Sequence, residues 1–347
     1  MSKIEDLLSK KILVLDGAMG TMLQEYKFSE EDFRGERFKN WPVSVQGNND
    51  LLSLTQPEAI AEIHRKYFLA GADIVETNTF SGTTIAMADY QMEDLVYELN
   101  YESARIAKKV ATELTVEDPK KPRFVAGAIG PTNKTASMSP DVNDPGYRAI
   151  SFEELKVAYR LQAQALIDGG VDILLVETVF DTLNAKAALF AIDELKEELN
   201  VDVPIMVSGT ITDASGRTLS GQTAEAFLIS VSHIPLLSIG FNCALGAKQL
   251  TPHLEVLNRY ANSGVSAYPN AGLPNAFGEY DQDAEEMADQ INEYLEKRLV
   301  NIIGGCCGTT PKHIRAIAEI VKNYQPREIP AGNEMERHAE FDSASQP

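Results

Sequence analysis

Gly169-Gly-Val-Asp-Ile-Leu-Leu-Val-Glu-Thr178 joins a pair of helix-ending glycines, an apolar run and a Glu-Thr pair. The segment Ala70-Gly-Ala-Asp-Ile-Val-Glu-Thr77 repeats this arrangement a hundred residues earlier. Short apolar runs of this kind are typical of strands buried on both faces, as in parallel sheets. The repeat therefore predicts two parallel strands that each follow a helix and end in a glutamate.

The same alternation extends over most of the chain. Eight apolar runs are predicted as strands, at 12–16, 72–76, 123–129, 171–176, 204–208, 236–241, 265–268 and 299–303. Helical patterns separate them, such as the one that Pro57 opens and Gly71 closes, and one that begins with a capping box of Ser151 and Glu154. Eight strands alternating with helices predict an α/β fold, a single (β/α)8 TIM-type barrel, with a doubly wound open sheet as the alternative.

The two ends of the chain differ from the repeating part. Residues 4–9 have the pattern of a short N-terminal helix, whereas the segment after about Arg327 is polar. The connection 25–56 is irregular and polar, and it predicts a long loop. We assign residues 1–326 to the barrel and residues 327–347 to a linker or disordered tail.

Composition excludes several classes of protein. The 347 residues carry 31 basic and 51 acidic side chains, a net charge of −20, and no basic run. An acidic surface argues against nucleic acid and anionic membrane as partners. No apolar run approaches the roughly 20 residues that span a bilayer, and the first residues lack a signal layout. We expect a cytoplasmic protein.

The three cysteines occupy equivalent places. Cys306 and Cys307 stand between glycines in Gly304-Gly-Cys-Cys-Gly308, directly after the last apolar run, and Cys243 follows the sixth run. An isolated cysteine is often a small core residue, and a disulfide between neighbours is strained and unexpected in a reducing compartment. Three thiolates with an open fourth position are the pattern of a catalytic zinc site.

Other polar residues are predicted at the same end of the barrel, where the active site of this fold lies. They are Asp16, Glu76, Asn133, Glu177, Asn242 and Asn270. Each has a structural alternative: Asp16 as a cap, Asn270 as a turn residue, and the two glutamates as partners of basic residues in the barrel mouth. Their convergence nevertheless predicts a site.

The residue types indicate a chemistry. Zinc held by three thiolates suits the binding of a fourth, substrate thiol, because coordination deprotonates a thiol whose free pKa is about 8.5. Asp16 and Glu177 are suited to an ammonium group, and backbone N–H groups from Gly17 to Gly20 to a carboxylate. The sequence predicts alkylation of a small amino acid that carries a thiol.

Several motifs resemble the homocysteine S-methyltransferase domain over roughly residues 10–325. They are Asp16-Gly-Ala-Met-Gly-Thr, Glu76-Thr-Asn-Thr-Phe, Gly130-Pro-Thr-Asn, Glu177-Thr, Gly240-Phe-Asn-Cys-Ala, Tyr268-Pro-Asn-Ala-Gly and Gly304-Gly-Cys-Cys-Gly-Thr-Thr-Pro. Phe33-Arg-Gly, Gly47-Asn-Asn-Asp and Ser220-Gly-Gln-Thr are most similar to the N-terminal homocysteine-binding module of cobalamin-dependent methionine synthase. Betaine-dependent relatives look more distant, since they carry Tyr where this chain has Thr178.

The resemblance implies a reaction and its residues. Methylcobalamin would methylate L-homocysteine to give methionine, and 5-methyltetrahydrofolate would regenerate the donor. Cys243, Cys306 and Cys307 would bind Zn²⁺, with Asn270 as a possible fourth ligand when substrate is absent. The residues implied in binding homocysteine are Asp16, Gly17, Ala18, Glu177 and Asn242.

The chain departs from a complete enzyme of that kind. None of its five histidines stands in the Asp-x-His-x-x-Gly pattern that ligates cobalt, and the chain is too short for a folate barrel. We therefore expect a corrinoid-binding module in cis or in trans, or free cofactor, with 327–347 as the linker toward it. Alternatives are a homocysteine methyltransferase that uses S-methylmethionine or betaine, a non-catalytic module that binds zinc or homocysteine, and a barrel whose cysteines form a redox switch.

Overall fold

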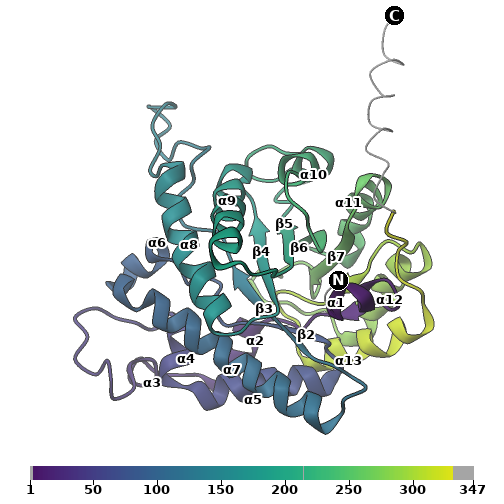
Figure 1. The fold of residues 1–347 in the computed structure, drawn as a ribbon, viewed down its shortest axis with the longest axis horizontal. Helices are drawn as coiled ribbons and strands as arrows, with labels where there is room; N and C mark the ends of the chain where they lie inside the picture. The colour runs from purple at the N-terminus through teal and green to yellow at the C-terminus, as the bar shows by residue number, and fades with distance from the viewer. Residues whose placement is uncertain (1–2, 214, 331–347) are drawn as a thin grey trace, which may run out of the picture.

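A computed structural model of the protein describes residues 3–213 and 215–330, and its eight strands are surrounded by helices (Figure 1). The strands are β1 (Leu13–Val14), β2 (Ile74–Glu76), β3 (Phe124–Ile129), β4 (Ile173–Val179), β5 (Ile205–Gly209), β6 (Ser238–Gly246), β7 (Gly264–Asn270) and β8 (Ile302–Ile303). All neighbouring strands are parallel, in the order β1-β8-β7-β6-β5-β4-β3-β2.

The two ends of this sheet meet. Leu15 and Ile74 form a parallel bridge, and the N–H of Asp73 donates to the carbonyl oxygen of Val14 at 2.7 Å, so that β1 adjoins β2. Each predicted strand overlaps an observed one. The TIM-type barrel is confirmed, and the open doubly wound sheet is excluded.

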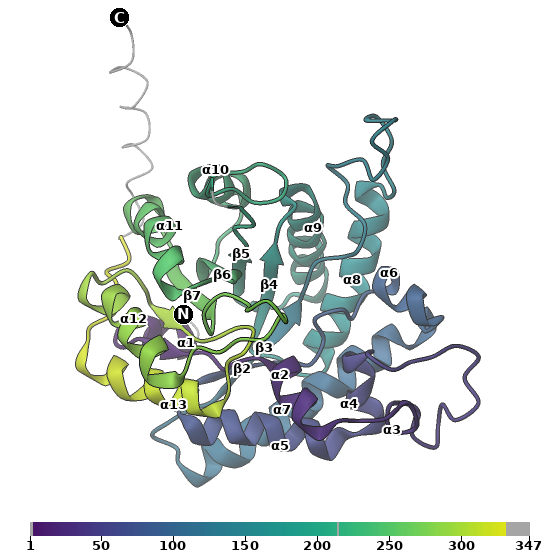
Figure 2. The same cartoon turned by 180° about the vertical axis from the view of Figure 1, so that it is seen from behind.

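The helices form the outer layer, which Figure 2 shows from the opposite side. They are α1 (Lys3–Leu8), α2 (Met19–Tyr26), α3 (Glu30–Arg34), α4 (Leu52–Thr55), α5 (Pro57–Ala70), α6 (Thr84–Met87), α7 (Val96–Glu117), α8 (Phe152–Asp168), α9 (Thr182–Leu199), α10 (Ala224–Val231), α11 (Ala247–Tyr260), α12 (Ala284–Glu296) and α13 (Pro311–Ile320). Among the described residues, no helix is long and apolar enough to cross a membrane.

Capping boxes mark the beginnings of two helices, one of them within a segment predicted to be a loop. The predicted capping box of Ser151 and Glu154 opens α8. The prediction of a long irregular loop over 25–56 was wrong in part, because α3 and α4 lie within it. Ser29 and Asp32 form a second capping box that stabilises α3. These helices of five and four residues are too short to show helical periodicity.

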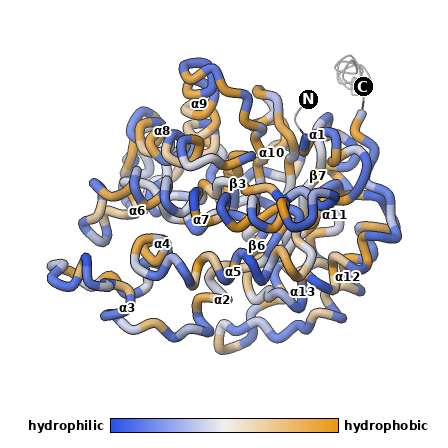
Figure 3. The backbone as a smooth tube through the Cα atoms, turned by 60° about the horizontal axis from the view of Figure 1, so that its bottom comes forward, coloured by the Kyte–Doolittle hydropathy of each residue, from blue (hydrophilic) through white to orange (hydrophobic). Residues whose placement is uncertain are grey.

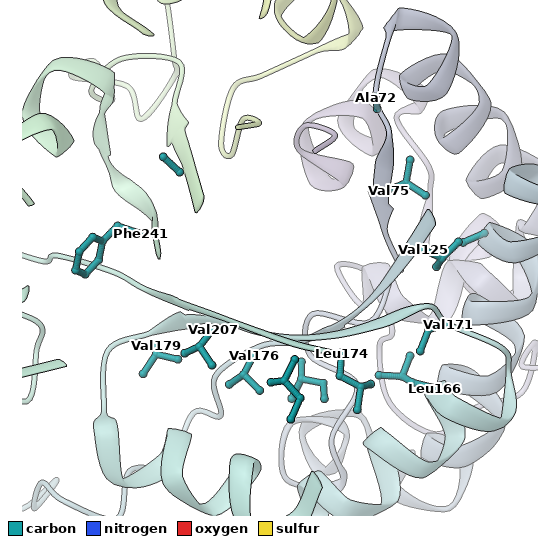
Figure 4. Packing of buried hydrophobic residues seen from close by; sticks show 14 of the residues in the cluster. Ala72, Val75, Val125, Leu166, Val171, Leu174, Val176, Val179, Val207 and Phe241 are labelled. Carbon is teal, nitrogen blue, oxygen red and sulfur yellow. The ribbon is translucent and has the colours of Figure 1, made fainter. Parts of the chain in front are cut away.

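Side chains that alternate along the strands build two separate cores. Leu174 and Val176 of β4 face the helices, where Leu166 of α8 also lies, whereas Ile173 and Leu175 face the interior of the barrel. Along α8 and α9 the residues alternate between hydrophilic and hydrophobic, as expected for helices that cover a sheet (Figure 3). Figure 4 shows the packing between strands and helices in detail.

Helix α1 closes the amino-terminal end of the barrel. Ile4 and Leu8 are buried with Leu13 and Leu237 in the interior core. Arg327 packs at the same end, 3% exposed, where its guanidinium donates to the carbonyl oxygen of Ala261 at 2.6 Å. Ile329 packs against the same interior core, so the packed part of the chain extends at least three residues beyond the predicted boundary at 326. Residues 331–347 of the predicted tail lie outside the described residues.

Candidate active site

The three cysteine thiols meet at the carboxyl end of the barrel. Cys243 lies near the end of β6, and Cys306 and Cys307 follow β8. The Sγ atoms of Cys243 and Cys307 are 3.6 Å apart, those of Cys306 and Cys307 are 4.0 Å apart, and all three lie within 4.8 Å of one another. Tetrahedral coordination with metal–sulfur bonds of about 2.3 Å places sulfurs about 3.8 Å apart. The free thiols therefore have the spacing of a tetrahedral metal site.

An irregular backbone holds Cys243 in place. Cys243 and Ala244 have φ values of 60° and 55°, the left-handed region that residues with a side chain rarely adopt, and the register of β6 against β7 shifts between Asn242 and Gly246. Such strain, about 1–3 kcal/mol per residue, persists where the surrounding structure fixes it, often at functional sites. The bulge turns the thiol of Cys243 toward those of the double cysteine.

The double cysteine is fixed by its neighbours on both sides. The N–H of Cys306 donates to the carbonyl oxygen of Pro269 at 2.8 Å, and the N–H of Cys307 donates to Oδ1 of Asn270 at 3.1 Å. The hydroxyl of Thr309 donates to the carbonyl oxygen of Cys306 at 2.6 Å. Both thiols are thereby oriented by backbone contacts that do not depend on a bound ion.

Tyr280 is a member of this site that sequence reasoning did not find. Its hydroxyl accepts from Nδ2 of Asn270 at 3.4 Å, and Tyr280 contributes to lowering the pKa of Cys307. A Cβ atom added to Gly308, which has φ 78°, would overlap the Tyr280 side chain. The glycine after the double cysteine thus makes room for the ring, a relation that no local pattern reveals.

The pKa values of the thiols are unequal. Hydrogen bonds from Cys243, Cys306 and Tyr280 lower the pKa of Cys307 to about 3. Hydrogen bonds with Cys243 and Cys307, together with burial, raise the pKa of Cys306 well above its usual value. One thiolate is therefore stabilised by the cluster itself, while full ionisation of all three requires a cation.

Two buried carboxyl groups, those of Asp16 and Glu177, and the half-buried one of Glu76 lie beside the cysteines on the wall of the same cavity. Burial is the main cause that raises the pKa of each, to about 7 for Glu76 and well above the usual value for Asp16 and Glu177, whose negative neighbours raise it further. The cavity has a volume of about 1340 Å³, and among the described residues no lysine or arginine lines it. The carboxyl groups thus have no basic partner, contrary to the structural alternative for the two glutamates.

The beginning of α2 supplies N–H groups at the same wall. Gly17, Ala18, Met19 and Gly20 line the cavity, and the first N–H groups of a helix have no partner within it. The N–H of Ala18 is already used, since it donates to Oγ1 of Thr309 at 3.1 Å. A Cβ atom at Gly17 would overlap the side chains of Thr309 and Tyr67, so this close approach requires glycine.

Asn242 and Asn270 lie behind the cavity wall. Oδ1 of Asn242 accepts from the N–H of Thr178 at 3.1 Å and from the hydroxyl of Ser208 at 2.7 Å, and its Nδ2 donates to Oγ1 of Thr178 at 2.8 Å. It holds Thr178, whose φ is 52°, at the bulge of β4 that carries Glu177. The predicted residues Asp16, Glu76, Asn133, Glu177 and the three cysteines line the cavity, whereas these two asparagines support it.

Comparison with known proteins agrees with this arrangement. The sequence profile of the homocysteine S-methyltransferase family matches residues 13–321, and the chain belongs to that family. Membership bears out the predicted resemblance.

Solved structures show the same fold. Homocysteine methyltransferase MmuM from Escherichia coli, in its metallated form, is 24% identical with a TM-score of 0.69, over 90% of this chain and 96% of that one. A B12-independent methionine synthase from Shewanella sp. W3-18-1, in complex with selenomethionine, is 15% identical with a TM-score of 0.50, over 90% and 98% of the two chains.

Proposed function

We propose that this protein transfers a methyl group from methylcobalamin to the thiol of L-homocysteine, giving methionine, at a zinc site formed by Cys243, Cys306 and Cys307. The observation that carries the proposal is the convergence of three thiols, at the spacing of a tetrahedral ion, with three carboxyl groups of the cavity wall that lack a basic partner. Family membership supports the reaction class.

The residues present fit zinc, because three cysteines leave the fourth position open. When bound there, zinc would lower the pKa of the substrate thiol so that it reacts as a thiolate. Asn270 is proposed as the ligand that fills the fourth position without substrate. Its oxygen now accepts from the N–H of Cys307, so ligation would exchange that hydrogen bond for a bond to the metal.

The chain's own residues would orient the amino acid. Asp16, Glu76 and Glu177 would surround the ammonium group of homocysteine, whose positive charge would lower the raised pKa values of these acids. N–H groups at the start of α2 would hold the carboxylate. Asn242 is proposed to act indirectly, through the position of Thr178 and Glu177.

Methyl transfer would then require that the methyl donor approach the sulfur of homocysteine. When presented at the cavity, methylcobalamin would supply the methyl group: a new sulfur–carbon bond to homocysteine would replace the carbon–cobalt bond, whose electron pair would stay with the corrinoid. We propose that a corrinoid-binding module, in cis or in trans, presents the donor and that 5-methyltetrahydrofolate remethylates it elsewhere. The absence of lysine and arginine from the lining of the described cavity disfavours anionic folate as the direct donor.

The acidic cavity also favours a second candidate donor, S-methylmethionine, which carries a positively charged sulfonium and ammonium group. The overall likeness to the homocysteine methyltransferase MmuM is compatible with either donor, since at 24% identity it supports the fold alone. The experiment that follows also distinguishes betaine as the methyl donor and a module that binds zinc or homocysteine without catalysis.

Purified protein is loaded with zinc under reducing conditions and incubated with homocysteine and methylcobalamin, S-methylmethionine or betaine. We expect one zinc per chain and methionine with methylcobalamin. Methionine from another donor alone would reassign the donor, and zinc with homocysteine binding but no methionine from any donor would indicate a binding module. The C306A protein, expected to lose zinc and activity together, is the control for the site.

A further inference from the structure

The cavity extends away from the cysteines into a second region, which we call the outer lobe. It is lined by residues from the loops that follow β1, β2 and β3, namely 47–50, 78–81, 86, 89–90 and 131–133. The short helices of these loops, α3, α4 and α6, lie on one side of the barrel in both Figure 1 and Figure 2. The outer lobe contains the Gly47-Asn-Asn-Asp motif, to which the reaction of homocysteine gives no role.

Asp50 is the unusual residue of the outer lobe. It is only 4% exposed, yet it lines the cavity and has no basic partner. The N–H of Ser81 donates to its Oδ2 at 2.7 Å, and its Oδ1 has no partner among the described residues. Burial raises the pKa of Asp50 to about 7. A carboxylate accepts up to about four hydrogen bonds, and a buried one that accepts a single bond is costly unless a ligand completes it.

The surroundings of Asp50 are fixed and negative. Nδ2 of Asn78 donates to the carbonyl oxygen of Asn49 at 2.8 Å, and Nδ2 of Asn133 donates to Oδ2 of Asp89 at 3.1 Å, so that side chains tie the three loops together. Phe80, 42% exposed, adds an aromatic surface. The outer lobe therefore offers carboxylate and amide oxygens beside an aromatic ring, and it suits a ligand with N–H groups or positive charge.

Homocysteine cannot be the occupant of both regions. Its ammonium and thiol groups are accounted for by the acids and cysteines of the inner region, and 1340 Å³ exceeds what most drug-sized ligands fill. A second ligand must enter the same cavity for methyl transfer. Outside the inner region the described lining also includes Phe180 and residues 277–281, but the only buried carboxyl group there is Asp50, in the outer lobe.

We propose that the outer lobe recognises the methyl donor, and that Asp50 accepts a hydrogen bond from an N–H group of that donor. This inference rests on the proposed function. Two donors supply the required chemistry: corrinoids carry primary amide side chains around the ring, and S-methylmethionine carries an ammonium group.

The test is Asp50→Asn. The amide oxygen of the new asparagine can still accept from the N–H of Ser81, while an NH₂ group replaces the free carboxylate oxygen. The N–H group of the methyl donor then meets another N–H group in place of a hydrogen-bond acceptor. Titration calorimetry of zinc-free protein with methylcobalamin and with S-methylmethionine measures donor binding without turnover. We expect the donor that binds wild-type protein to bind D50N at least about tenfold more weakly, the effect of losing a hydrogen bond to a charged group.

Homocysteine binding to zinc-loaded D50N should stay within about twofold of wild type. The matched control is Asp141→Asn, the same change on an exposed loop residue outside the cavity, which should leave both affinities unaltered. The methyl donor that binds D50N more weakly than it binds wild-type protein is the one whose N–H group contacts Asp50.

Three results would overturn the inference: equal donor affinity in D50N and wild type, binding of neither donor to wild type at millimolar concentration, or tight binding of 5-methyltetrahydrofolate. Failure of zinc-loaded protein to bind homocysteine would instead contradict the proposed function. The two failures are separate because the donor titrations use neither zinc nor homocysteine.

Discussion

The two ends of the barrel interior are built from the same strands but differ in chemistry. On β4 the inward-facing residues pass from Ile173 and Leu175 to Glu177, and on β2 from Ile74 to Glu76. The amino-terminal end is apolar and closed by α1, whereas the carboxyl end opens into a cavity lined by acids and thiols. A step of one pleat, two residues, thus separates residues that stabilise the fold from the acids of the proposed homocysteine site, whose charged forms are disfavoured by burial.

The largest effect is expected from a substitution that changes only the carboxyl end of the barrel. Cys306→Ala should abolish zinc binding and lower methyl transfer by at least about a thousandfold, because the substrate thiol loses its metal. Folding should survive, since the cluster lies at the barrel mouth. Metal analysis, methionine formation and circular dichroism check this, and retained zinc with turnover would refute the ligand assignment.

A second substitution, Asp50→Asn, should raise the free energy of unfolding at neutral pH. The pKa of buried Asp50 is about 7 against an ordinary 3.8, so between these values the folded state binds a proton that the unfolded state has lost. Its contribution to the free energy of unfolding therefore falls as pH rises from about 4 to about 7, by up to about 4 kcal/mol. Because an asparagine side chain does not titrate, the free energy of unfolding of D50N should not show this decrease.

The difference in unfolding free energy between D50N and wild type should accordingly grow in favour of D50N from pH 4 to pH 8. Urea unfolding at both pH values measures it, with D141N as the reference for an exposed acid. Parallel pH dependence of D50N and wild type would show that burial does not raise the pKa of Asp50.

Leu175→Ala tests the apolar end. Leu175 is fully buried in the interior core, and such truncations cost about 2–5 kcal/mol of unfolding free energy. Zinc stoichiometry and homocysteine affinity per folded molecule should be unchanged below the unfolding transition. Loss of zinc from folded L175A would mean that the two ends are not independent.

Glu177→Gln should give the smallest effect. The variant keeps the shape of the side chain but removes one charge from the three acids around the expected ammonium group. Zinc should remain bound, while homocysteine should bind about tenfold more weakly. Unaltered homocysteine affinity would place the ammonium elsewhere.

The barrel was predictable because its signals are local and repeated. Apolar runs followed by Glu-Thr marked β2 and β4, and glycines around Cys306 and Cys307 marked exposed thiols at a strand end. Since parallel strands end at one edge of the barrel, their terminal residues had to converge.

Other features depend on contacts that the sequence does not encode locally. Tyr280 reaches Cys307 only because its loop folds over Gly308. The side chain of Asn242 turns to Thr178 across 64 residues of chain, and Asp50 depends on the N–H of Ser81 in a separate loop. Strand ends locate a site, but side-chain partners decide which of its residues face the substrate.

X-ray absorption at the zinc edge, recorded without and with L-homocysteine, directly tests whether the three cysteines hold a zinc ion that binds the substrate thiol. We expect three sulfur ligands and one lighter ligand in the free protein, and four sulfur ligands after homocysteine is added. A protein that binds no zinc under reducing conditions, or a sulfur count that homocysteine leaves at three, would contradict this expectation.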